Sequence, residues 1–121
     1  MIDLSTLSPE QRAEIIRTVR DTAVRLMKPE RIILFGSAAR DQPSPDSDLD
    51  ILIVQETDLP FAKRGIQLRL ALADLRVPMD IIVLTPAEFE KYRDVPGMLQ
   101  HIACATGKVI YEREVTAQAS R

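Results

Sequence analysis

Two short apolar runs joined by a polar loop most constrain the fold of this chain. The stretch from 35 to 54 reads FGSAARDQPSPDSDLDILIV, and it links an apolar run at 31–35 to a second one at 49–54. The loop at 41–47 contains two prolines and no apolar residue, which argues against a helix or a strand there. Both runs are short and apolar on both faces, so we predict two buried strands.

Further helices and strands are predicted around this pair. Ser8, Pro9 and Gln11 form a helix start, and apolar residues then recur at three- and four-residue spacings, which predicts a helix over 8–28. The same reasoning predicts helices over 60–76, 85–93 and 96–106, and strands over 79–84 and 108–111. In the helix at 60–76 one face is expected to carry the apolar residues Phe61, Leu68, Leu72 and Leu75, and Gly65 weakens the first turns.

The order of these elements predicts an α/β (α+β) fold, a mixed β-sheet with helices packed on it. The loop at 41–47 permits antiparallel pairing of the first two strands, whereas the helix between 49–54 and 79–84 suits a crossover between parallel neighbours. We expect a single domain over 1–112, followed by a frayed tail over 113–121.

Composition argues against several classes of protein. The net charge of -2 gives no general attraction to nucleic acid, and a single cysteine excludes an internal disulfide. The first residues lack the basic start and apolar stretch of a signal peptide, and no apolar run approaches the ~20 residues of a membrane span. We therefore expect a cytoplasmic protein without direct contact with nucleic acid or membrane.

Three carboxylates mark the candidate site. Asp48 and Asp50 lie two residues apart at the start of the 49–54 strand, so both side chains project from the same face. Asp50 and Asp80 each lie between apolar neighbours, where an uncompensated carboxylate is costly. If the strands at 49–54 and 79–84 are neighbours, the three acids meet at one end of the sheet. Two Mg²⁺ ions would offset their repulsion, so these aspartates are the predicted metal ligands and catalytic residues.

The end of the first apolar run has the features of a phosphate-binding turn. Gly36 permits close approach of the backbone, and the Ser37 hydroxyl and the amides after Gly36 can hold phosphate oxygens. Arg40 can stabilise a departing pyrophosphate. Gly-Ser turns and surface Asp pairs are each common, but their conjunction with a third acid in the next strand favours a nucleotide site bound by Gly36, Ser37 and Arg40.

The spacing of these residues resembles a known signature. Gly36-Ser37, ten residues and then Asp48-x-Asp50 look like the signature of the DNA polymerase beta-like nucleotidyltransferase superfamily. FGSAAR followed by SDLDILIV is especially similar to the minimal nucleotidyltransferases, the MNT proteins. Asp41 is a departure, because relatives commonly have Gly after the arginine.

The resemblance implies a fold, an activity and a partner. It implies a mixed sheet that binds Mg²⁺ and a nucleoside triphosphate and transfers a nucleotidyl group. By position, Asp48 and Asp50 match the metal-binding pair, Asp80 matches the third acid, and Ser37 matches the residue that contacts the phosphates. MNT proteins of this size resemble antitoxins paired with helical HEPN toxins, which are RNases. Family behaviour implies that the antitoxin transfers AMP from ATP to a toxin tyrosine. Two alternatives stay open: a non-catalytic antitoxin that acts by occlusion, and a small-molecule (antibiotic-type) nucleotidyltransferase.

Other candidate residues favour ordinary roles. His101 and Cys104 lie three apart on a predicted helix, but no further His or Cys exists to complete a zinc site. Tyr92 and Tyr111 suit packing or surface positions better than self-modification. The arginines of the 8–28 helix are expected to form a solvated face, and the alternative is a surface for an acidic partner or RNA.

Overall fold

A mixed four-stranded sheet forms the centre of the computed structural model, which describes residues 2–40 and 43–113. The strand order is β3-β2-β1-β4. β1 pairs antiparallel with β2 and with β4, and β2 pairs parallel with β3, so the predicted mixed sheet is confirmed. The strands are β1 (Arg31–Phe35), β2 (Leu49–Val54), β3 (Met79–Leu84) and β4 (Lys108–Glu112).

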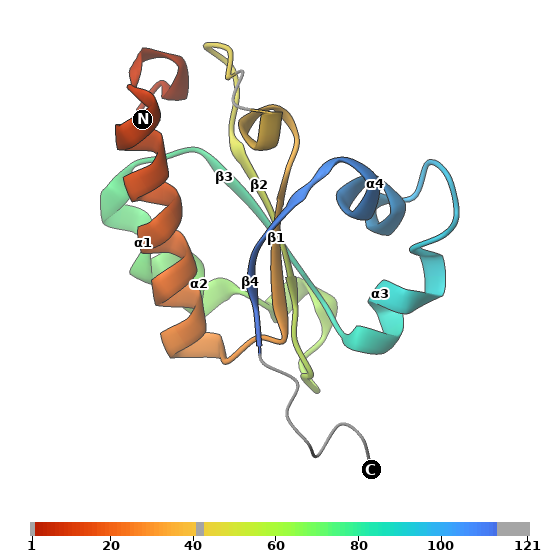
Figure 1. Cartoon of the computed structure of the whole chain (residues 1–121). Coiled ribbons are helices and arrows are strands. Elements are labelled where there is room, and N and C mark those ends of the chain that lie inside the picture. The colour runs from red at the N-terminus through yellow and green to blue at the C-terminus, as the bar shows by residue number, and fades with distance from the viewer. Residues whose placement is uncertain (1, 41–42, 114–121) are drawn as a thin grey trace.

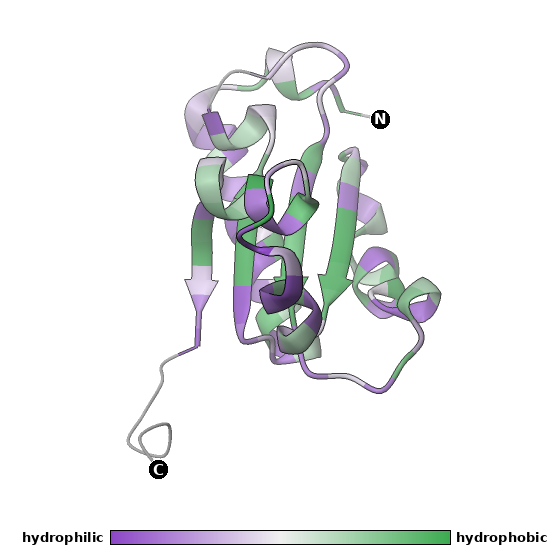
Figure 2. Ribbon diagram, turned by 90° about the vertical axis from the view of Figure 1, so that its right-hand side faces the viewer, coloured by the Kyte–Doolittle hydropathy of each residue, from purple (hydrophilic) through white to green (hydrophobic). Residues whose placement is uncertain are grey.

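Helices cover both faces of this sheet, with α1 and α2 on one side and α3 and α4 on the other (Figure 1). The strand residues alternate between two apolar clusters, one packed against each pair of helices, and Figure 2 shows the strands as largely hydrophobic. This two-sided burial explains why the strands are apolar on both faces. The helices are α1 (Pro9–Met27), α2 (Ile66–Ala71), α3 (Pro86–Tyr92) and α4 (Leu99–Thr106).

Capping boxes fix the starts of two helices. The Ser8 hydroxyl accepts from the backbone N–H of Gln11, whose side chain accepts from the backbone of Ser8, so α1 begins where the sequence predicts. Thr85 and Glu88 form the same reciprocal pair at the start of α3. Short 3-10 turns fill several connections: η1 (Leu4–Thr6), η2 (Ser37–Arg40), η3 (Phe61–Lys63) and η4 (Ala73–Leu75).

The single helix predicted over 60–76 is wrong. Gly65 adopts a left-handed conformation with φ of 80°, so the segment divides into η3, α2 and η4. Leu68 and Leu72 are buried as expected, but Phe61 is 58% exposed because it lies before this break. Gly97, with φ of 89°, likewise delays α4, which begins at Leu99 rather than at 96. The predicted frayed tail covers 113–121. The backbone N–H of its first residue, Arg113, donates to the carbonyl of Glu30 at 2.8 Å, and the rest of the tail lies outside the described residues.

None of the helices in the described parts of the chain has the length and apolar character needed to cross a membrane.

Arg64 ties the segment after β2 to both β3 and α3. Its guanidinium group donates to the backbone carbonyls of Leu59 and Val83, at 2.9 and 3.2 Å, and to both carboxylate oxygens of Glu88, at 2.7 and 3.3 Å. The Arg64 side chain is only 9% exposed. Arg64 is also the largest cause of the lowered pKa of Glu88. The hydrogen bonds of Arg64 therefore hold a bent segment in place where the sequence pattern predicted one continuous helix.

Replacing Arg64 with Ala is expected to lower the free energy of unfolding by about 2 kcal/mol, since four hydrogen bonds are lost, one of them to the carbonyl of the buried Val83. Urea unfolding measures the change. The matched control is Arg17→Ala, which removes one exposed ion pair with Glu14 and should cost less than about 0.5 kcal/mol. Equal losses in the two variants would contradict the role given to Arg64.

Candidate active site

The antiparallel pairing of β1 with β2 places Gly36 in contact with Asp50. Phe35 pairs with Asp50 at the end of β1, and the chain then turns at Gly36, which has φ of 76°. A Cβ atom added at Gly36 would lie 2.2 Å from Oδ2 of Asp50. No side chain larger than hydrogen fits this position while Asp50 stays in place. The turn predicted to hold phosphate is therefore in direct contact with one predicted metal ligand.

The parallel pairing of β2 with β3 brings the third acid to the same place. Asp50 is in register with Asp80, and Asp48 precedes Asp50 by two residues on the same face of the sheet. This is the face that α3 and α4 cover further along the strands. The three carboxylates thus lie at one end of the sheet. Asp80 is exposed because β3 is an edge strand, so the predicted burial cost at Asp80 is wrong.

Burial and neighbouring charge raise the pKa of Asp50 to about 6, from an ordinary value of 3.8. Partial desolvation is the largest cause, followed by the negative charges of Asp48 and Asp80 and a hydrogen bond with Asp48. A carboxyl group with this pKa is partly protonated near neutral pH, and the bound proton reduces the repulsion among the three acids. A divalent cation would reduce the same repulsion more strongly.

The side chains of the three aspartates are not arranged around a single point where a metal ion would bind. Across residues 2–40 and 43–113, no group of three or more His, Cys, Asp or Glu side chains is arranged to hold a metal ion. The donor set nevertheless fits a hard cation: all three side chains offer oxygen atoms, and two of them raise the pKa of the third. Asp48, Asp50 and Asp80 are the residues that would hold Mg²⁺.

A hydroxyl network that the sequence pattern does not predict joins the two ends of the polar loop. Ser37 Oγ donates to Ser47 Oγ at 2.9 Å, and Ser47 Oγ also accepts from the backbone N–H of Ser44 at 2.7 Å. Ser47 directly precedes Asp48, so this network links the phosphate-binding turn to the carboxylates. The only signal in the sequence was the serine beside Asp48. Arg40 lies exposed at the end of η2, and Asp41 lies outside the described residues.

The remaining candidates lie away from this site. His101 Nδ1 is 3.0 Å from the backbone oxygen of Arg93, and Cys104 is exposed on α4. Tyr92 is half-buried at the end of α3, where Lys91 Nζ lies 5.2 Å from its ring centre. Tyr111 packs from β4 against the cluster under α1.

Comparison with known proteins identifies the family. Residues 8–116 match the family described as "Polymerase beta, Nucleotidyltransferase". The chain belongs to this nucleotidyltransferase family. The matched range spans all four strands and all three carboxylates, and members of the family generally use a nucleoside triphosphate and a divalent metal ion. No curated protein matches the chain.

Two solved structures share the nucleotidyltransferase fold. One is a toxin–antitoxin complex with AMP-PNP, with 23% identity and a TM-score of 0.55, and the other is a mutant of the toxin–antitoxin complex MntA-HpeT, with 21% identity and a TM-score of 0.54. Each similarity covers 89% of this chain and 76% of the other. The predicted polymerase beta-like fold is thereby confirmed.

Proposed function

We propose that this nucleotidyltransferase transfers AMP from ATP to a tyrosine hydroxyl of a partner toxin of the HEPN type. The proposal rests on the position of Asp50, which contacts Gly36 and lies beside the negative charges of Asp48 and Asp80. A carboxylate in this position could bind a cation that in turn binds a triphosphate held at the Gly36 turn. The catalytic roles of the three acids and the nucleotide-binding roles of Gly36, Ser37 and Arg40 belong to this proposal.

The three carboxylates have two tasks in the reaction, metal binding and acceptance of a proton. Asp48, Asp50 and Asp80 would hold Mg²⁺, which when bound supplies positive charge to the triphosphate and lowers the pKa of the acceptor hydroxyl. The acceptor oxygen forms a bond to the α-phosphorus, and the bond from that phosphorus to the bridging oxygen breaks. Pyrophosphate leaves with the electron pair, and the hydroxyl proton passes to Asp80, the most accessible carboxylate.

The backbone and two polar side chains position the nucleotide. Gly36 lets a phosphate approach the main chain closely, and the Ser37 hydroxyl can turn from Ser47 to donate to a phosphate oxygen. Arg40 lies exposed at the end of η2, where its charge can offset that of the departing pyrophosphate. The structural similarity to a complex with AMP-PNP supports ATP as the nucleotide, and the two toxin–antitoxin complexes support a toxin as the acceptor.

Mass spectrometry tests the reaction and its target together. The product of the neighbouring gene is incubated with this protein, Mg²⁺ and ATP, and we expect one or more added AMP masses on a tyrosine. Omission of Mg²⁺ and the Asp48→Asn variant are the controls, and both should leave the partner unmodified. An unchanged partner mass under conditions in which the two proteins bind would contradict the proposal.

A non-catalytic antitoxin is the second candidate. It is favoured by the open arrangement of the acids, since no three of the described side chains form a ready metal site. In that case the Asp48→Asn, Asp50→Asn double variant would still neutralise the toxin. Loss of neutralisation by a double variant that still forms the complex would exclude occlusion as the mechanism.

A further inference from the structure

A groove with an apolar floor and a cationic rim lies between α1 and the β4 side of the sheet. Its volume is about 430 Å³, and its floor includes Ile16, Leu34 and Leu49. Arg17 and Arg20 from α1 border it, and Lys108 from the start of β4 lies across from them. The groove is on the face covered by α1, opposite the face that carries the carboxylates.

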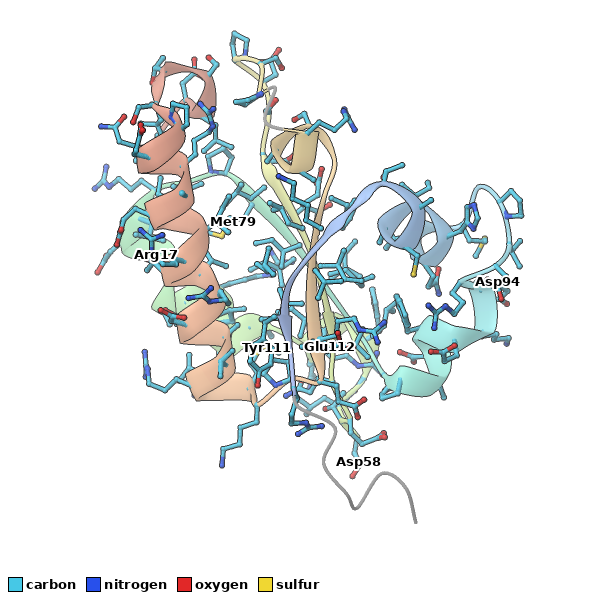
Figure 3. The ribbon with its side chains drawn as sticks, in the orientation of Figure 1. Arg17, Asp58, Met79, Asp94, Tyr111 and Glu112 are labelled. Carbon is cyan, nitrogen blue, oxygen red and sulfur yellow. The ribbon has the colours of Figure 1, made fainter. Side chains whose placement is uncertain are left out.

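The described residues that line this groove carry charge of one sign. Arg12 is a fourth cation among them, and none of the lining residues within 2–40 and 43–113 is acidic, although the whole chain has a net charge of -2. The ion pairs of Arg17 with Glu14 and of Arg20 with Asp21 are solvent-exposed and therefore weak, so both arginines can exchange partners. The groove thus offers several cations above an apolar floor. Figure 3 shows Arg17 on α1 among other charged side chains.

We propose that this groove is the docking site for an acidic, amphipathic segment of the partner protein. Such a segment would place apolar side chains on the floor and carboxylates against the rim, which is how amphipathic helices occupy hydrophobic grooves. Nucleic acid fits the groove less well, because none of the lining residues in the described part of the chain is aromatic and bases would find no stacking surface on them. The identification of the occupant as the acceptor protein rests on the proposed function.

The floor of the groove is the reverse side of the candidate active site. Leu49 lies between Asp48 and Asp50 in sequence and faces the groove, whereas the two aspartates face the opposite side. Ala38, which follows Ser37 directly, also lines the groove. A partner held here would therefore lie over the same strand ends that carry the carboxylates, on the opposite face of the sheet.

A binding experiment with defined probes tests this docking site. The probe is a fluorescein-labelled helical peptide with Glu on one face and Leu on the other, and fluorescence anisotropy measures its affinity. The groove variant Arg17→Glu/Lys108→Glu should weaken binding at least about tenfold, or about 1.4 kcal/mol. The control Arg25→Glu/Lys63→Glu changes the net charge equally, at exposed positions outside the groove, and should bind like the unmodified protein.

Two further probes decide between the outcomes. A matched peptide with Lys in place of Glu should not bind, and a single-stranded RNA should neither bind tightly nor displace the acidic peptide. Equal binding of the acidic peptide to all three proteins would overturn the proposal, because binding would not depend on the groove cations. Equal weakening in the groove variant and in the control variant would also overturn it, because it would show only a general charge effect. Displacement by RNA that depends on Arg17 and Lys108 would assign the groove to nucleic acid instead. Circular dichroism checks that each variant is folded.

The docking proposal and the transfer reaction can fail separately. Asp50→Asn should bind the acidic peptide with unchanged affinity, since Asp50 lies on the other face of β2. The groove variant should retain binding of a fluorescent ATP analogue but modify the partner slowly. Normal modification of the partner by the groove variant would overturn the docking site but leave the proposed transfer reaction standing. If the unmodified protein binds the peptide but does not modify the partner, the transfer reaction is overturned and the docking site stands.

Discussion

Replacing Asp50 with Asn is expected to abolish nucleotidyl transfer and, at the same time, to stabilise the metal-free protein at pH 7. The variant keeps the size of the side chain but removes one of the charges that would hold Mg²⁺ against the triphosphate. Loss of a metal-binding carboxylate should lower the rate of AMP transfer by at least about 1,000-fold. Transfer from labelled ATP measures this loss, and full activity in the variant would exclude the proposed mechanism.

The gain in stability follows from the raised pKa of Asp50. The folded protein holds a proton on Asp50 up to about pH 6, whereas the unfolded chain releases it near 3.8. Between these values the folded state binds more protons, so stability falls as the pH rises and stays low above about pH 6. Asp50→Asn removes this penalty. The full shift corresponds to about 3 kcal/mol, but Asp50 is only half-buried and solvent screens its charge, so we expect a gain of about 1 kcal/mol.

Thermal unfolding at several pH values tests this linkage. The difference between Asp50→Asn and the unmodified protein should be small at pH 4 and largest at pH 7. Asp58→Asn is the control, since Asp58 is exposed beyond the other end of β2 (Figure 3) and should show no such pH dependence. Mg²⁺ should raise the melting temperature of the unmodified protein but not that of Asp50→Asn. A variant less stable than the unmodified protein at pH 7 would contradict the electrostatic account.

Replacing Gly36 with Ala is expected to lower transfer at least about 100-fold through displacement of the Asp50 carboxylate. The new methyl group would lie 2.2 Å from Asp50 Oδ2, well inside van der Waals contact, so either the carboxylate or the turn must move. The positive φ of 76° adds about 1 kcal/mol of backbone strain. Steady-state kinetics with ATP and urea unfolding measure the two effects.

Gly97→Ala is a matched control for this substitution. Gly97 also has a positive φ, of 89°, but a Cβ atom there would meet nothing within 4 Å. Both variants should therefore lose similar stability from backbone strain, while only Gly36→Ala loses activity. Equal activity in the two variants would show that the close contact between Gly36 and Asp50 is not needed for transfer.

Much of this arrangement was predictable from local sequence. The strands at 31–35, 49–54 and 79–84 have the predicted bounds, because short apolar runs bounded by Gly, Pro and polar residues leave few alternatives. The prediction of one helix over 60–76 was wrong because the apolar spacing continues across Gly65. The backbone at Gly65 is left-handed, and Arg64 donates to Glu88 of α3. Tertiary contacts of this kind override a periodic pattern.

The sequence by itself determined the components of the site: a glycine turn after one strand, two aspartates at the start of the next, and a third aspartate in the strand after that. Only the tertiary structure placed Asp80 in register with Asp50, set Asp50 against Gly36 and joined Ser37 to Ser47. It also formed the cationic groove behind these residues from α1 and β4. The physical reason is that residue type and spacing act locally, whereas strand register and helix packing depend on contacts between segments far apart in the chain.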